Sequence, residues 1–275
     1  MSRLYGRPFY KVYRLYEEPT DWFYIKNISG ESADLSISSS GYVPFCVEWS
    51  FDKTNWTLME GDWFDTIEDN QTVYLRSTDG WSKNENNRRF LNIGFEAEVG
   101  GNLETLINWK NYGSNLTVPD HCFRQMFDQN AYNIKDASNL TSGNIKNVGS
   151  NSFYCMFQSC GNLENIGDFS SIQKVGYRGM YYMFNGCNNL GNAIDLSNVT
   201  EITEYSLNYL YYGCYNIGEV TVPKLSEWNT NNTQQWLQST GSNVQSKTAH
   251  VPAGVTIPQD NSGVPSGWTR VEYQN

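Results

Sequence analysis

One short motif recurs at a constant distance and constrains the fold more than any other feature of this chain. Three copies begin 27 residues apart, at Met156-Phe157, Met183-Phe184 and Leu210-Tyr211. Each copy continues with a cysteine, an asparagine and an aliphatic residue at the same offsets. A fixed period of this length is typical of a solenoid, in which each repeat buries its apolar face by stacking on the next. The second half of the chain is therefore expected to form a short solenoid.

The repeat register extends beyond these three copies. Met126-Phe127 begins an earlier, imperfect copy, with Ala131 in place of the cysteine. An aliphatic residue lies 8 residues before each of the four motifs, at Val118, Val148, Val175 and Ile202. We expect the core of the coils to contain Met156, Phe157, Cys160, Leu163, Met183, Phe184, Cys187, Leu190 and Cys214.

Composition limits the classes of partner. The 275 residues carry a formal net charge of −10, and the pI is about 4.7. An acidic surface of this kind argues against nucleic acid and anionic membranes as partners. No apolar run approaches the ~18 residues of a membrane span, so none is expected. The first residues lack the apolar segment of a signal peptide, which predicts assembly in the cytoplasm.

Cysteines and aspartates in the repeats have structural explanations. The chain has six cysteines and two histidines but no Cys-x-x-Cys pair, so a zinc site is not expected. Three cysteines occupy the repeat register, which favours reduced thiols packed in the core. Asp168 and Asp195 recur two residues before Ser170 and Ser197. A role in capping corners is favoured for them over coordination of Ca²⁺.

Motifs of common enzyme classes are missing from the chain. It contains no P-loop, no GxGxxG, no GxSxG and no HExxH. Acidic residues are numerous, but nothing singles out a catalytic pair of carboxylates. We therefore expect a protein that is not an enzyme, with no catalytic residue, no metal and no cofactor.

The chain is expected to divide into four segments. These are an N-terminal arm (1–20), a β-sandwich-like module (21–98), the repeat solenoid (99–250) and a C-terminal cap (251–275). Strand-forming residues in the module predict strands over 22–28, 34–38, 45–51, 56–59, 72–76 and 90–95. Residues 103–109 are expected to form a short helical or cap segment, and residues 229–246 a long polar loop or an irregular coil. The fold class is therefore mainly β with short helices.

The arm is basic and aromatic, whereas the rest of the chain is acidic. It contains no acidic residue before Glu17. This contrast favours docking of the arm either onto its own body as an edge strand or onto a partner chain. The residues expected to anchor it are Arg3, Tyr5, Arg7, Phe9, Tyr10, Tyr13 and Arg14.

Tyrosines gather in the best-matched repeats, with eight between residues 177 and 215. Tyrosine offers rigid contact area with a polar end and is enriched at interfaces. Packing in the core is the alternative explanation for these rings. The candidate binding surface consists of Tyr181, Tyr205, Tyr209, Tyr212, Trp228 and Trp236.

The repeat motifs resemble a known family. The segments 154–163 (YCMFQSCGNL) and 182–190 (YMFNGCNNL) resemble BspA-type leucine-rich repeats. The segment 251–254 (VPAG) is similar to the C-terminal end of that family, and 47–56 (VEWSFDKTNW) resembles a β-rich module found ahead of such repeats. The resemblance covers residues 22–275. Members of the family occur in surface proteins of Bacteroidetes and in phages that infect these bacteria.

This resemblance implies adhesion or recognition rather than catalysis. Together with the missing export signal, it predicts a structural or appendage protein of a virion, such as a head fibre, capsid decoration or tail component of a crAss-like phage. The arm would contact other virion proteins in a multi-subunit assembly, and the solenoid would bind a host surface glycan or protein. A bacterial cell-surface adhesin is the alternative, followed by a glycan-cleaving enzyme.

Overall fold

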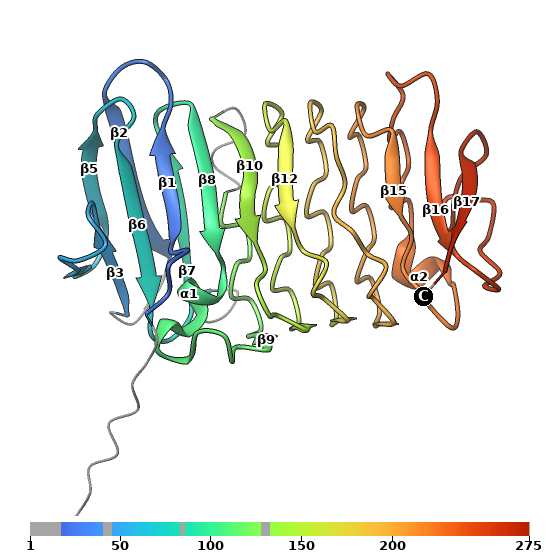
Figure 1. Cartoon of the computed structure of the whole chain (residues 1–275), viewed down its shortest axis with the longest axis horizontal. Helices are drawn as coiled ribbons and strands as arrows, with labels where there is room; N and C mark the ends of the chain where they lie inside the picture. Colours follow the sequence, from blue (N-terminus) through green and yellow to red (C-terminus); the bar gives the residue numbers. More distant parts are fainter. Residues whose placement is uncertain (1–17, 41–45, 83–85, 128–132, 275) are drawn as a thin grey trace, which may run out of the picture.

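The computed structural model describes residues 18–40, 46–82, 86–127 and 133–274. Over these ranges the chain is mainly β, with seventeen strands, two short α-helices and one 3₁₀ helix. The molecule is elongated, and from β8 onward β10, β12, β15, β16 and β17 follow one another along its long axis (Figure 1). The anchoring residues expected in the arm, from Arg3 to Arg14, lie outside the described residues.

The first eight strands form two antiparallel arrangements, which we call the N-terminal sheets. Their inward residues share one core, with Phe23, Leu35, Leu75 and Leu91 almost fully buried. The first arrangement has the order β8-β1-β6-β3-β4, and the second has the order β5-β2-β7. The bounds are β1 (Phe23–Asn27), β2 (Ala33–Ser40), β3 (Val47–Ser50), β4 (Thr57–Leu58), β5 (Trp63–Ile67), β6 (Thr72–Ser77), β7 (Arg88–Ile93) and β8 (Ala97–Asn102).

The six strands expected from the sequence are present, and β5 and β8 are two that it did not predict. β8 pairs antiparallel with β1 on one side and parallel with β10 (Ile134–Thr141) on the other. β10 in turn pairs parallel with β12 (Asn165–Asp168). One seven-stranded sheet therefore runs across the boundary expected at residue 98. The short helices α1 (Glu104–Asn108) and η1 (Trp109–Asn111) follow β8, where a helix was expected.

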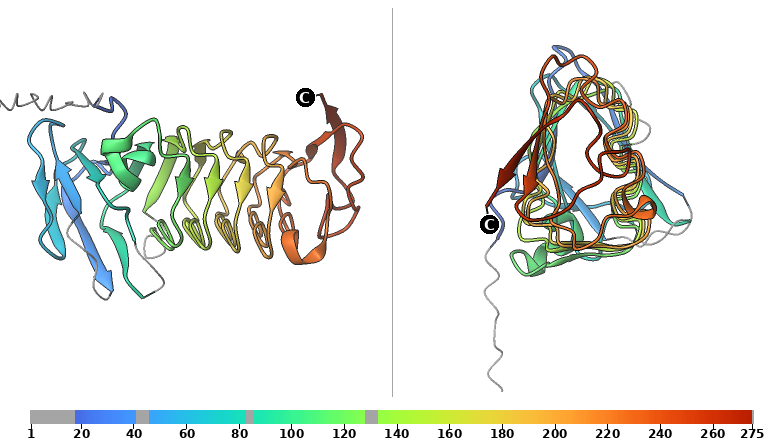
Figure 2. Two further views of the ribbon diagram at one scale, coloured as in Figure 1. Left: turned by 90° about the horizontal axis from the view of Figure 1, so that it is seen from below. Right: turned by 90° about the vertical axis from the view of Figure 1, so that its right-hand side faces the viewer.

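Residues 116–127 and 133–252, which we call the repeat region, pair in parallel from one repeat to the next. A ladder of short strands contains β9 (Thr117–Val118), β11 (Asn147–Val148), β13 (Lys174–Val175) and β14 (Glu201–Ile202). Val148 lies beside Val118 and Val175, so the aliphatic positions identified in the sequence stack directly. Seen along the long axis, the repeats outline a triangle (Figure 2). Short strands on two sides leave the third side to irregular turns.

We call this third side the turn column; it contains residues 119–127, 149–160, 176–187, 203–214 and 229–240. Alternate backbone N–H groups donate to carbonyls of the next repeat: Phe157 N lies 2.9 Å from Met183 O, and Phe184 N lies 3.0 Å from Leu210 O. Non-glycine residues with positive φ recur in register, as at Tyr182 (57°) and Tyr209 (59°). The strain is spread through the column because each turn is held by its neighbours.

Aromatic rings stack through the core of the repeat region. Phe127, Phe157, Phe184 and Tyr211 form a column with ring centroids 4.8, 5.6 and 5.6 Å apart. The cysteines beside them are buried free thiols, and Cys187 Sγ lies 3.0 Å from the carbonyl oxygen of Phe157. The nine residues expected in the core, from Met156 to Cys214, each have an exposed fraction of 0%.

Residues 229–246 adopt the second of the two forms expected for them, an irregular coil rather than a long loop. They begin with the short helix α2 (Thr230–Thr233) and continue the turn column. Tyr209 N donates to Gln234 O and Tyr211 N donates to Trp236 O, both at 2.9 Å. Trp236 lies next to Tyr211 as a fifth ring of the column, at 6.4 Å. This repeat lacks the Met-Phe and cysteine of the motif, so the sequence pattern did not reveal it.

The C-terminal end closes the stack with parallel strands. β15 (Glu219–Thr221), β16 (Thr248–Pro252) and β17 (Thr269–Tyr273) form one sheet. Arg270 donates to the carbonyls of Ile257, Pro258 and Val264, which ties the last loop to β17. Corners of the repeats are capped as expected, since Asp168 Oδ1 accepts from Ser170 N and Asp195 Oδ1 accepts from Ser197 N, each at 2.8 Å.

Candidate functional site

The turn column carries a row of tyrosines that we call the tyrosine surface: Tyr154, Tyr181, Tyr182, Tyr209 and Tyr212. Each is partly exposed. Tyr154 and Tyr181 stack at 5.4 Å with nearly parallel rings, and Tyr182 and Tyr209 stack at 4.7 Å. An edge-to-face contact of 4.4 Å between Tyr181 and Tyr182 joins the two stacks. Each ring therefore has a fixed orientation while part of it remains open to solvent.

A hollow of about 400 Å³ lies on this surface, and we call it the repeat hollow. Two columns of the repeat register line it: Gln158, Asn185 and Tyr212 are 27 residues apart, and Tyr182 and Tyr209 precede Gln235 in the second column. Its lining combines aromatic rings with amide groups and contains no charged side chain. Burial, followed by the contact with Tyr181, raises the pKa of Tyr182, so this hydroxyl keeps its proton at neutral pH.

A second group of rings surrounds Arg178. Its guanidinium lies 5.1 Å from the ring of Tyr177, 5.5 Å from Tyr181 and 5.4 Å from Tyr205. Tyr177 and Tyr205 contact each other edge to face at 5.9 Å. Arg178 is thus occupied by stacking on these rings, and Tyr205 contacts Tyr177 and Arg178 without lining the repeat hollow.

The structure corrects one expected member of the binding surface and supplies others. Trp236 is fully buried, and its Nε1 donates to Gly263 O at 2.6 Å, because it is the fifth ring of the core column. Trp228 is half-buried and contacts Trp236 at 6.1 Å. Gln158, Asn185 and Gln235 were not predicted to contribute. Extending the 27-residue register from Tyr212 would have found the first two.

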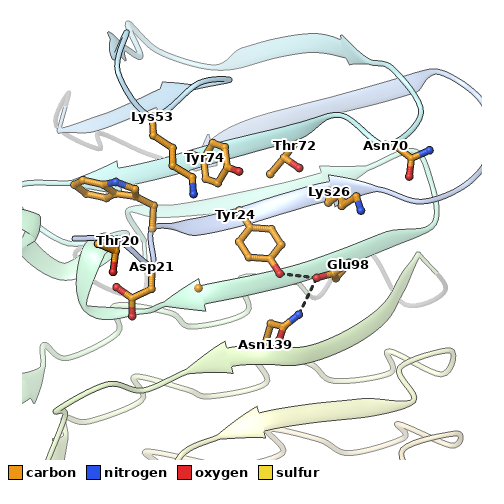
Figure 3. A pocket seen from close by; sticks show the side chains of 12 residues that line it. Thr20, Asp21, Tyr24, Lys26, Lys53, Asn70, Thr72, Tyr74, Glu98 and Asn139 are labelled. Carbon is orange, nitrogen blue, oxygen red and sulfur yellow. Dashed lines mark hydrogen bonds between the residues drawn. The ribbon is translucent and has the colours of Figure 1, made fainter. Parts of the chain in front are cut away.

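A second hollow, of about 560 Å³, lies elsewhere, on the open face of β1, β6 and β8 (Figure 3). We call it the sheet hollow. Tyr24 lies at its centre and donates from its hydroxyl to Glu98, which also accepts from Asn139 at 3.0 Å. Lys53 reaches over the ring of Tyr74 at 4.5 Å from the ring centroid. Burial, followed by the hydrogen bond to Glu98, raises the pKa of Tyr24, which therefore stays a donor at neutral pH.

Two glycines in β8 make room for the sheet hollow. A Cβ on Gly100 would lie 2.5 Å from the ring of Tyr24, so only glycine lets this ring lie across β8. Gly101 has φ +84°, and a Cβ there would lie 2.0 Å from the carbonyl oxygen of Trp22. The sequence did not point to this site, since its residues come from four strands and Tyr24 and Glu98 are 74 positions apart.

Comparison with protein-family models, with curated proteins and with solved structures finds no match to this chain. In the described ranges, no group of three or more His, Cys, Asp or Glu side chains is arranged to hold a metal ion. No helix among those residues is long and apolar enough to cross a bilayer. The function therefore has to be argued from the two hollows and their chemistry.

Proposed function

We propose that this chain is a non-enzymatic recognition protein whose tyrosine surface binds a glycan on the surface of a host bacterium. The observation that carries the proposal is the repeat hollow, where stacked, partly exposed tyrosines alternate with amide side chains. The rings of Tyr182, Tyr209 and Tyr212 offer faces to the C–H groups of a sugar. Gln158, Asn185 and Gln235 offer donors and acceptors to its hydroxyl groups.

The same proposal assigns the repeats to a leucine-rich-repeat solenoid of the BspA type. Parallel pairing of Val118, Val148, Val175 and Ile202 at successive positions supports this assignment. So does the column of buried rings that continues through every repeat. Stacked repeats present one extended face, which suits contact with a polymer better than enclosure of a small molecule.

We place the protein in a phage virion, as a head fibre, capsid decoration or tail component. The resemblance of the repeats to those of Bacteroidetes surface proteins and their phages supports this placement. Other virion proteins are the proposed partners of residues 1–20. Mass spectrometry of purified phage particles tests the placement, and detection of the chain on bacteria free of phage would instead favour a cell-surface adhesin.

Binding of the labelled full chain to Bacteroides cells tests the recognition proposal. Periodate oxidation of surface glycans should abolish binding, whereas protease treatment of the cells should leave it intact. Binding should persist at about 0.5 M salt, because ring stacking is insensitive to ionic screening. Loss of binding after protease alone would contradict a glycan ligand, and shortening of capsular polysaccharide by the protein would contradict a non-enzymatic role.

Two variants and a control assign the binding to the repeat hollow. Tyr182→Ala and Tyr209→Ala each remove a ring that lines it, and together they should weaken binding by about tenfold or more. Tyr215→Ala is the matched control, because Tyr215 is a partly exposed tyrosine of the same region outside the hollow. Equal effects of the double variant and the control would contradict the assignment.

A further inference from the structure

We propose that the sheet hollow is a second binding site and that its ligand is an acidic saccharide, a pyranose carrying a carboxylate. The site lies mainly on the N-terminal sheets, with Asn139 of β10 at its edge, and shares no residue with the repeat hollow. Its volume of about 560 Å³ falls within the ~300–1,000 Å³ that is usual for ligand sites.

An aromatic platform forms the floor of this hollow. Tyr24 lies across β8 over Gly100, and Tyr74 meets it edge to face with centroids 6.2 Å apart. The hydrogen bond from the hydroxyl of Tyr24 to Glu98 fixes the position of the ring. A fixed, partly exposed ring inside a polar hollow suits the apolar C–H face of a pyranose.

The hollow is lined by two lysines and two carboxylates, so the charge of its ligand depends on which of these groups remain available for contact. Both of its carboxylates have partners within the protein: Glu98 accepts from Tyr24 and Asn139, and Asp21 Oδ1 accepts from the hydroxyl of Tyr112 at 2.7 Å. Among the described residues, the two lysines that line the hollow have no such partners for their ammonium groups. Across the described ranges neither Lys26 nor Lys53 forms an ion pair, and the ammonium group of Lys53 lies over the ring of Tyr74.

Unpaired lysines are notable in a chain of net charge −10, where carboxylates outnumber ammonium groups. Their attraction for a carboxylate is strengthened inside a hollow that excludes part of the solvent. Thr72 and Asn139 line the same space and supply neutral partners for sugar hydroxyls. A small inorganic anion would use the lysines alone, and a neutral sugar would use the rings alone. An acidic saccharide uses both.

Calorimetric titration of the full chain with trigalacturonate tests this proposal. The matched ligands are its methyl ester, which keeps the three rings without the charges, and acetate, which keeps the carboxylate without a ring. We expect trigalacturonate to bind at least about tenfold more tightly than either matched ligand. Unlike the binding proposed for the repeat hollow, its affinity should fall as salt is raised.

The variants Lys26→Gln and Lys53→Gln test whether these two lysines attract the carboxylates of the saccharide. Combined, they should remove the preference for the acid over the ester, and the ester's own affinity should stay unchanged. Lys146→Gln, a lysine of the repeat region, is the control. Circular dichroism and the melting temperature confirm that these partly exposed substitutions leave the fold intact.

Several outcomes of these titrations would contradict an acidic-saccharide site in the sheet hollow. The proposal is overturned by no measurable binding up to about 10 mM trigalacturonate, by equal affinity for acid and ester, or by acetate binding as well as the trisaccharide. It also fails if Tyr182→Ala with Tyr209→Ala abolishes trigalacturonate binding while the lysine variants do not. That outcome would move the acidic ligand to the repeat hollow and leave the glycan proposal standing.

Discussion

The N-terminal sheets and the repeat region are both built from β-strands, but they obtain their order in different ways. In the N-terminal sheets each strand meets a different sequence, as when Phe23 faces Leu75 across the β1–β6 pair. In the repeat region each position meets its own copy, as when Val148 lies between Val118 and Val175. Because equivalent positions pair with one another, the sequence period alone predicts the strand pairing of the repeat region. Pairing between unlike strands leaves more freedom to shape a unique hollow.

The two hollows reflect this difference. Copies of the same register positions line the repeat hollow, so its chemistry is uniform and uncharged. Side chains from strands distant in sequence line the sheet hollow, which combines rings, lysines and carboxylates. A periodic surface suits a polymer with a repeating structure, whereas an irregular hollow suits one particular chemical group.

A substitution that breaks the column of rings in the repeat region should destabilise the protein most. Phe157→Asp places a carboxylate between Phe127 and Phe184, where the side chain is fully buried. It should lower the free energy of unfolding by about 4 kcal/mol or more, because a buried charge without a partner is costly. Denaturant titration followed by circular dichroism measures this.

The control for this charge is Phe64→Asp in β5, where the ring is 64% exposed. Its effect on the free energy of unfolding should stay within about 0.5 kcal/mol. If Phe157→Asp costs no more than Phe64→Asp, the column of rings does not stabilise the repeats.

A smaller effect is expected where the N-terminal sheets join the repeats. Gly101→Ala should cost about 2–4 kcal/mol, because the added Cβ meets the backbone of Trp22 at a positive φ. Gly30→Ala is the matched control, with φ +87° and no atom within 4 Å of the added Cβ. The control carries the conformational cost alone, about 1 kcal/mol. Equal melting temperatures of the two variants would show that β1 and β8 do not need this close approach.

Alkaline pH should lower the free energy of unfolding gradually, through ionisable groups buried in the repeat region. Burial raises the pKa of Cys187, Cys214 and Tyr211 well above the ordinary values. The folded state therefore holds these protons more tightly, and stability should be constant below the thiol pKa of the unfolded chain, about 8.5, and fall above it. Urea midpoints measured from pH 7 to 10 should decline, and a flat profile would contradict the burial of these groups.

The same thiols give a second measurement. A maleimide should react with all six cysteines in denaturant but with none in the folded protein at neutral pH, since every cysteine is buried. Rapid labelling of the folded chain would show that the repeats open, and a mass that reveals disulfides would contradict the reduced state.

The sequence alone predicted those elements that show a fixed period or an alternation of apolar and polar residues. It placed the ladder of Val118 and its copies, and six of the eight N-terminal strands. β8 was missed because it crosses the boundary expected between residues 98 and 99. Its Gly100 and Gly101, which are unusual within a strand, serve the close approach of Tyr24 and Trp22. Trp236 was assigned to the surface because its repeat lacks the motif. The sheet hollow could not be predicted, since no local pattern relates residues that only strand pairing brings together.

Removal of the arm should change the stability of the protein least. Deleting residues 1–17 should leave the melting temperature unchanged within about 2 °C, since among the described residues the pairing of the N-terminal sheets begins at Trp22. The deletion stops short of Asp21, whose carbonyl accepts from Asn102 N at 2.8 Å and ties the chain to β8.

If the arm anchors the protein in a virion, the shortened chain should remain folded yet be missing from purified particles. A large loss of stability would show instead that the arm is an edge strand of its own body. Normal incorporation of a stable shortened chain would mean that the contact with other virion proteins lies on the acidic body, most directly on its exposed apolar residues Phe51, Leu58 and Phe64.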